Sequence, residues 1–337
     1  MARPAVTALS AAFAIMRRDP AIGGSCAVAE RQPIPTHLNL FLVCVVLGGT
    51  LFQLYGMPAV LHVLGVPAVG LLLPIMLLQP LHWGLLHEGI HAQLFSNRRA
   101  NEFWARALSI LLGLPFDGTR FAHLVHHRFP RHGYDRPDVH AGSGSYALAW
   151  IGYRIRLFGG VYLSELAAPL VACVPTSLGI RLMERAIPIL EQGDAQIQRL
   201  YISLVLNFAK RRRTRRAFAM SLALYGASVW AYGAWWPVLL GAMYMRGFWH
   251  SLADNVPHHD VALDKRARAR NYRVPLGVHL LLMNHNLHLT HHLYPKVPWT
   301  ALGAVSLGDG ESPVDNYFRA ALAQTNRVFP IVVVNST

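Results

Sequence analysis

Three short histidine motifs are the residues of this chain best suited to chemistry. Their patterns are HxxxH, HxxHH and HxxHH, at His87–His91, His123–His127 and His288–His292. Imidazole is a common ligand of iron, zinc and copper, and side chains three or four residues apart share one face of a helix. Of the 18 histidines, all except His37 and His62 lie in residues 82–140 and 250–292. This clustering predicts a site that holds more than one metal ion.

The first motif permits a second interpretation. Its sequence, His87-Glu88-Gly89-Ile90-His91, matches HExxH, in which two histidines bind zinc and the glutamate is the base of a peptidase. Such a site needs only one further protein ligand and leaves the fourth position to water. The two HxxHH motifs would then have no role, so a membrane zinc peptidase is the weaker hypothesis.

The composition indicates a membrane protein. The chain has 337 residues, of which 53% are hydrophobic and only 14% are charged, whereas soluble domains carry roughly 25% charged residues. We expect one catalytic membrane domain over residues 36–310, a cytosolic or interfacial leader over 1–35 and a tail over 311–337. The three cysteines form no CxxC pair, so we expect no part for them in the chemistry.

The net charge of +14 raises the question of nucleic-acid binding. The strongest basic run, residues 210–216, directly precedes a long apolar stretch. Lys and Arg gather at the cytoplasmic ends of membrane helices and set their orientation. We therefore expect the charge to orient the protein in a bilayer and expect no nucleic-acid partner.

Four apolar stretches predict two helical hairpins. Leu38–Tyr55 and Met57–Leu78 are each close to the ~20 residues that span a bilayer, with a turn expected at Gly56-Met57-Pro58. Ala217–Tyr232 and Val238–Ser251 form the second pair. The predicted fold is an all-α integral membrane protein with about four transmembrane helices in two hairpins. A cytoplasmic helical cap carries the histidine motifs.

The stretch Tyr146–Leu182 is harder to assign, because it contains Arg154, Arg156 and Glu165 among apolar residues. We expect an interfacial or partly inserted helix there. All three histidine motifs fall on the side where the hairpins begin and end. This placement counts against a third hypothesis, a non-enzymatic metal carrier, which would place histidines along a path inside the spans.

The order of the motifs resembles the integral-membrane fatty acid desaturase and hydroxylase superfamily. HxxxH is followed about thirty residues later by HxxHH, and a second HxxHH follows the second hairpin. The setting Asn286-Leu287-His288-Leu289-Thr290-His291-His292-Leu293-Tyr294-Pro295 resembles the third motif of that family closely. The likeness extends over roughly residues 38–300.

The resemblance implies two iron ions held by nine histidines. One comes from an NxxxH element, which Asn255-Val256-Pro257-His258-His259 supplies, with His259 as the expected ligand and His258 as the alternative. Asn255 would hold an iron-bound water. The implied ligands are His87, His91, His123, His126, His127, His259, His288, His291 and His292. The residues expected to orient their rings are Asp135, Asp138, Asp254 and His285.

The resemblance also implies O₂ activation at a non-haem di-iron centre and hydrogen abstraction from an unactivated C–H bond. Desaturation of a fatty acyl chain is the expected reaction. Hydroxylation, carotenoid-type oxygenation and decarboxylation of a fatty acid to a terminal alkene remain alternatives. Electrons would come from an external donor such as a ferredoxin, docked on the basic face. The expected location is a bacterial inner membrane, with the catalytic face cytoplasmic and a lipid or fatty acyl substrate.

Overall fold

Helices dominate the described chain, in agreement with the all-α class expected from the sequence. The computed structural model describes residues 32–140, 144–189, 193–308, 310, 312–326 and 328–330. The expected leader over residues 1–35 lies outside these residues except for its last four.

The first hairpin is built from apolar residues. Its outgoing rod consists of α2 (Thr36–Leu51), a π-helical turn (Phe52–Gly56) and α3 (Met57–Leu64). The return consists of a 3-10 turn (Val66–Leu71), α4 (Leu72–Leu77) and α5 (Gln79–Ile90). By length and composition, Thr36–Leu64 and Val66–Ile90 are two of three candidate membrane spans among the described residues.

The turn of this hairpin lies at Gly65, so the prediction of a turn at Gly56-Met57-Pro58 is wrong. Gly56 keeps helical angles, and Pro58 lies in the first turn of α3, where a missing N–H is tolerated. Gly65 has φ 65° and ψ −150°, a region almost closed to residues with a Cβ. The chain therefore reverses at the later glycine.

The second hairpin joins α13 (Phe208–Tyr232) to α14 (Trp236–Asn255) through Gly233–Trp235. This agrees with the predicted pair of helices. Neither helix is among the three candidate spans of the described chain. The reason lies in their composition, since α13 begins with the basic run and α14 carries Arg246 and Asp254.

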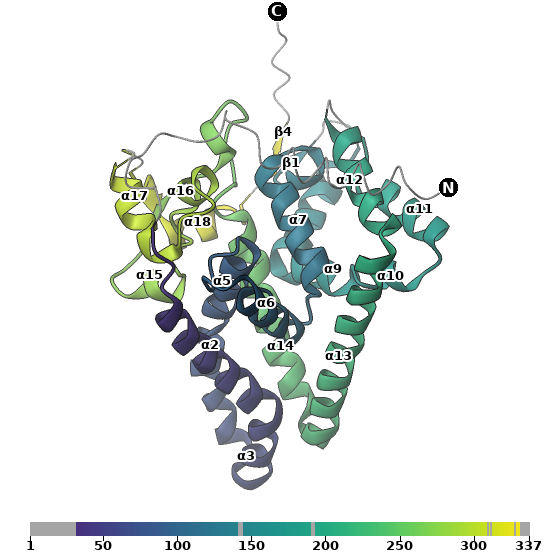
Figure 1. Cartoon of the computed structure of the whole chain (residues 1–337), viewed down its shortest axis with the longest axis vertical. Helices are drawn as coiled ribbons and strands as arrows, with labels where there is room; N and C mark the ends of the chain where they lie inside the picture. The colour runs from purple at the N-terminus through teal and green to yellow at the C-terminus, as the bar shows by residue number, and fades with distance from the viewer. Residues whose placement is uncertain are drawn as a thin grey trace, which may run out of the picture.

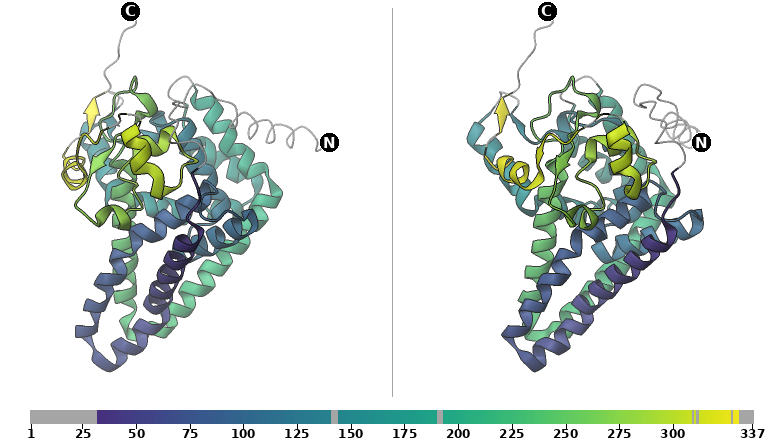
Figure 2. Two further views of the ribbon diagram at one scale, coloured as in Figure 1. Left: turned by 60° about the vertical axis from the view of Figure 1, so that its left-hand side comes forward. Right: turned by 90° about the vertical axis from the view of Figure 1, so that its left-hand side faces the viewer.

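The two hairpins pack together near their turns, at the lower end of the molecule in Figures 1 and 2. Their interface is apolar and includes Leu54, Leu61 and Leu239. Hydrogen bonds also cross it, among them those from Tyr232 Oη to the Gln53 carbonyl at 2.6 Å and from Ser228 Oγ to the Leu54 carbonyl at 2.8 Å. The hairpins thus form one apolar stem.

The third candidate span is Tyr146–Cys173, where the sequence predicted an interfacial or partly inserted helix. It comprises α8 (Tyr146–Ile155), a π-helical turn (Arg156–Gly160), α9 (Val161–Ala167) and α10 (Leu170–Cys173). Phe158 and Gly159 leave helical geometry, with φ 121° at Gly159. Each half, of about 12 residues, rises only ~18 Å, whereas the hydrocarbon core is ~30 Å thick. The segment packs against α14 at this break.

Most of the remaining elements lie above the stem in Figure 1. The helices are α6 (Arg98–Leu112), α7 (Phe116–Arg128), α11 (Thr176–Ala186), α12 (Asp194–Leu206), α15 (Val278–Leu281), α16 (His288–Leu293), α17 (Leu302–Gly308) and α18 (Tyr317–Ala323). The strands form two parallel pairs: β1 (Val139–His140) with β4 (Phe329–Pro330), and β2 (Tyr272–Arg273) with β3 (Asp315–Asn316). Part of the segment expected to be a tail thus packs on the body, where Tyr317 and Ala321 are buried.

Helix α7 is fixed by a charged contact at its start. Asp117 accepts hydrogen bonds from Arg106 of α6 at 2.9 Å and from Arg213 of α13 at 3.0 Å. Burial alone would raise the pKa of the Asp117 carboxyl, but these two guanidinium groups outweigh burial and lower it. The helix that carries the second histidine motif is therefore anchored to α6 and to α13.

We expect Gly65→Ala to lower the free energy of unfolding by about 1–3 kcal/mol, because alanine rarely adopts this backbone conformation. Space is not limiting, since an added Cβ meets no atom within 4 Å. Gly48→Ala in α2 is the control, because its Cβ also meets open space but its backbone is helical. Thermal unfolding in detergent measures both. An equal change in the free energy of unfolding of the two variants would contradict the role assigned to Gly65.

Candidate metal centre

Four segments bring histidines together above the apolar stem. α5 presents His87 in its last turn, and His91 follows directly after Ile90. α7 carries the second motif and α16 carries the third. The chain that leaves α14 after Asn255 supplies one more histidine.

One group, the five-histidine cluster, contains His87, His91, His123, His127 and His291. One ring nitrogen of each lies within 4.8 Å of all the others. Nε2 of His123 lies 2.9 Å from Nε2 of His91 and 3.0 Å from Nε2 of His127. Nε2 of His127 lies 3.0 Å from Nε2 of His291. Residues from all three sequence motifs therefore meet at one point.

The second group, the four-histidine cluster, contains His126, His258, His288 and His292 within the same 4.8 Å limit. Nε2 of His126 lies 3.1 Å from Nε2 of His258, and Nε2 of His292 lies 3.0 Å from Nε2 of His288. The rings of His127 and His292 stack with centroids 4.2 Å apart. The two clusters are thus direct neighbours.

The structure brings His258 to this cluster in place of the expected His259. The chain turns at the end of α14, where the backbone N–H groups of both residues donate to the Asn255 carbonyl. Nδ1 of His258 lies 2.8 Å from the Arg268 carbonyl, and its Nε2 faces His126. The His259 ring lies instead 5.4 Å from the ring of Phe329. Helical spacing does not decide which of the two rings faces the cluster, because α14 ends at Asn255, before both residues.

The donor set fits two transition-metal ions. Burial first, and then the charges of neighbouring imidazoles, hold the pKa of His123, His127 and His291 well below the ordinary value. Neutral imidazole is the form that binds metals. Nε2 of His87 is buried without a hydrogen-bond partner, and an ion among the five nitrogens would satisfy it. All nine donors are nitrogen, a set that suits iron, zinc or copper.

Two of the residues expected to orient the rings contact cluster histidines directly. Oδ2 of Asp135 lies 2.7 Å from Nδ1 of His126. Burial would lower the pKa of the His126 ring, but the Asp135 carboxylate outweighs burial and raises it. Nε2 of His285 lies 2.9 Å from Nδ1 of His87. Such contacts fix ring orientation and raise the basicity of a ligand.

Asp138 contacts the four-histidine cluster indirectly, through Arg131. It is fully buried and accepts hydrogen bonds from Arg131 at 2.9 and 3.0 Å. Arg131 also donates to the His258 carbonyl at 2.5 Å, so Asp138 holds the segment that presents His258. Arg131 carried no sequence signal beyond its place in a basic stretch.

Asn255 and Asp254 have other surroundings. The amide nitrogen of Asn255 donates to Tyr153 Oη at 2.9 Å and to Gln324 Oε1 at 3.0 Å, while Gln324 donates to the Leu252 carbonyl. Within the described chain, no hydrogen bond joins the Asn255 side chain to a cluster histidine, and its water-mediated role stays a prediction. Asp254 lines the cavity described below.

Glu88, the base of the HExxH interpretation, is buried and accepts a hydrogen bond from the backbone N–H of Trp299 at 3.2 Å. This contact ties α5 to the segment after the third motif. His82 lies off both clusters, with Nε2 3.0 Å from the Leu108 carbonyl.

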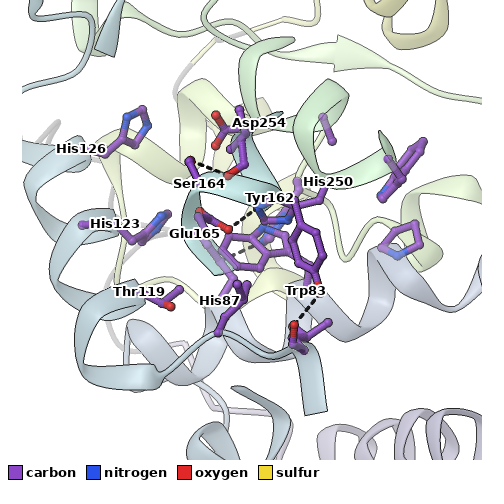
Figure 3. Close-up of a pocket in the computed structure, with 18 of the residues that line it drawn as sticks. Trp83, His87, Thr119, His123, His126, Tyr162, Ser164, Glu165, His250 and Asp254 are labelled. Carbon is purple, nitrogen blue, oxygen red and sulfur yellow. Dashed lines mark hydrogen bonds and ion pairs between the residues drawn. The ribbon is translucent and has the colours of Figure 1, made fainter. Parts of the chain in front are cut away.

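A cavity of about 270 Å³ opens beside the clusters. Figure 3 shows His87, His123 and His126 on its wall together with Tyr162, Glu165, His250 and Asp254. Oε2 of Glu165 lies 2.9 Å from Nε2 of His250. Leu112, Leu114 and Val161 supply apolar surface. The sequence did not indicate Glu165 and His250, because they come from α9 and α14, which meet only in the fold.

A family model described as fatty acid desaturase matches residues 61–309. Comparisons with curated proteins and with solved structures found no match. The matched region begins in α3 and ends after α17, so it contains all nine clustered histidines.

His258→Ala and His259→Ala form a matched pair for the ninth donor. We expect the first variant to lose about half of the bound metal and the second to keep it, because only His258 faces the four-histidine cluster. Metal content per chain, measured by plasma mass spectrometry on folded protein, reports both. Loss of metal from His259→Ala but not from His258→Ala would assign the ninth donor to His259.

Asp135→Asn should weaken metal binding about 10–100-fold, because His126 loses its carboxylate partner. The exposed Asp264→Asn serves as the control. Retention of metal during titration with a chelator measures the difference. Identical curves for the two variants would show that Asp135 does not support His126.

Proposed function

The chain belongs to the fatty acid desaturase family, and on that premise we propose that it is a membrane-bound di-iron oxidoreductase. It uses O₂ and external electrons to desaturate a fatty acyl chain. The coarser assignment, an oxidoreductase of the membrane desaturase and hydroxylase type, follows from the family itself.

The observation that carries the proposal is the division of nine histidines into two adjacent clusters. One iron would be held by His87, His91, His123, His127 and His291, and the other by His126, His258, His288 and His292. Two irons supply the O₂ chemistry that abstraction of hydrogen from an unactivated C–H bond requires, since no side chain is a strong enough oxidant.

The protein supplies geometry and a shielded space. Asp135 and His285 orient two of the rings. The cavity borders His87, His123, His126 and His288, so a substrate carbon placed there is next to both clusters. Tyr162 and Trp83 form part of its wall.

The membrane arrangement belongs to the proposal. Both hairpins cross the bilayer, with their turns on the far side and the clusters on the cytoplasmic side. The basic run 210–216 at the start of α13 supports this orientation, because Lys and Arg accumulate on the cytoplasmic side. A bacterial inner membrane fits such a topology.

The electron donor is proposed to be a small acidic protein such as a ferredoxin. The segments 98–106 and 210–216 carry many of the positive charges on the cluster side of the stem. Complementary charge accelerates docking of an acidic partner.

The same site admits hydroxylation, carotenoid-type oxygenation or decarboxylation to a terminal alkene, because all begin at one C–H bond beside the irons. A zinc peptidase centred on His87, Glu88 and His91 is the candidate from another class. It would leave His126, His258, His288 and His292 without a role, and Glu88 is already engaged with Trp299.

We expect a host that expresses this chain with a ferredoxin and its reductase to form a new alkene, alcohol or hydrocarbon. His291→Ala should abolish the product, because His291 contributes to the five-histidine cluster. Gas chromatography–mass spectrometry of lipids and volatiles measures the product and identifies the reaction.

His279→Ala is the matched control, since His279 lies in neither cluster. Metal analysis of the same preparations separates the candidates. Two irons per chain support the oxidoreductase, whereas a single zinc retained in the His291→Ala variant would favour the peptidase.

A further inference from the structure

The cavity beside the clusters contains more charge than an alkyl chain requires. Arg156, Glu165, Arg246, His250 and Asp254 all line it. Most of these charges have partners. Glu165 pairs with His250 at 2.9 Å, and Arg246 donates to Tyr225 Oη at 2.5 Å.

Arg156 is the exception. In the described chain, six arginines have a buried Nε without a hydrogen-bond partner: Arg120, Arg131, Arg154, Arg156, Arg211 and Arg246. Five of them use other guanidinium nitrogens in hydrogen bonds. Among the described residues, Arg156 makes no hydrogen bond and no ion pair. A buried guanidinium nitrogen without an acceptor is costly, and a ligand that supplies one removes this cost.

Asp254 is the charge of the lining that interacts most closely with Arg156, since Arg156 is the strongest electrostatic influence of any charge on it. Asp254 is exposed, and no hydrogen bond or ion pair within the described chain joins it to Arg156. Water in the empty cavity can therefore hydrate this carboxylate, whereas it does not reach Nε of Arg156. Arg156 therefore keeps a buried Nε without an acceptor, whereas Glu165 has an ion-pair partner in His250.

We propose that Arg156 binds the carboxylate of the substrate, and that the substrate is a free carboxylic acid rather than a thioester. This inference rests on the proposed function of the neighbouring clusters. Guanidinium and carboxylate match in geometry and form two parallel hydrogen bonds. A thioester carries no such anion at its carbonyl carbon.

The size of the cavity bounds the position of attack. At about 270 Å³, it lies near the lower end of the ~300–1,000 Å³ typical of small-molecule sites. Arg156 and the cluster residues His123 and His126 line this one small space. A carboxylate held by Arg156 therefore places the first carbons of the chain beside the histidines, and oxidation occurs near the carboxyl end.

An apolar groove on the far side of Tyr162 receives the rest of the chain. Tyr162 lines both the cavity and this groove, which is formed by Ile151, Phe158, Leu163 and Tyr244 among others. The groove has about 620 Å³ and lies at the break of the third candidate span. Its apolar lining suits an alkyl tail that arrives from the bilayer.

The test is a binding measurement that needs no turnover. Trp83 and Trp249 line the cavity, so quenching of tryptophan fluorescence by a bromine-labelled decanoic acid reports occupancy. The iron-loaded protein is placed in neutral phosphatidylcholine nanodiscs, with the brominated decanol of equal length as the uncharged probe. We expect the acid to bind more tightly than the alcohol.

Arg156→Gln should weaken binding of the acid roughly ten- to hundredfold and leave the alcohol unchanged, since a hydrogen bond to a charged group is lost. Arg156→Lys should recover part of the affinity. Arg181→Gln, an exposed arginine of α11, is the matched control and should bind both probes as the original chain does.

Equal affinity for the acid and the alcohol, or an unchanged affinity for the acid in Arg156→Gln, would overturn the proposal. So would tighter binding of decylamine, which would assign the site to Asp254. The iron content of each preparation is read separately. Two irons with no preference for the acid leave the oxidoreductase intact and remove only the carboxylate site, whereas absence of iron counts against the oxidoreductase whichever probe binds.

Discussion

The structure is organised around the convergence of nine imidazoles that are buried or half-buried. Lone pairs aimed at a common point need a positive ion to satisfy them. Every segment around the clusters serves this arrangement. The anchored start of α7, the contact between Asp135 and His126, and the turn that presents His258 each restrict where a ring can lie. The apolar stem includes α5 and therefore determines where His87 and His91 lie.

Much of the metal centre could be predicted, because the spacing of its histidines is a local property of the sequence. Histidines at i, i+3 and i+4 share a helix face whatever the tertiary structure, so the three motifs met as expected. The choice between His258 and His259 was not local, since it depends on how the chain turns after α14 and on the carbonyl of Arg268. The hairpin turn was misplaced for a similar reason. Gly56 and Pro58 resemble a turn in sequence, yet both fit a helix, and only the backbone angles at Gly65 reveal the reversal.

Apart from the clustered histidines, Asp135, Asp254 and His285, the charged and polar residues of the cavity could not be predicted from the sequence. Glu165, His250 and Arg156 lie on different turns of helices that meet only because α14 packs against the broken segment between α8 and α9. In sequence they look like isolated polar residues in apolar stretches, and Arg156 and Glu165, together with Arg154, made the assignment of Tyr146–Leu182 ambiguous. In the fold the same residues explain the ambiguity: the segment is apolar toward its groove and polar toward the clusters.

The hydrogen bonds from Gln324 to the end of α14 bear on the order in which the centre is made during translation. Every clustered histidine is synthesised before Gln324. A growing chain therefore carries the full set of donors while the turn that presents His258 still lacks the partner that holds Asn255. The contact that holds Asn255 is therefore the last part of this arrangement to be synthesised.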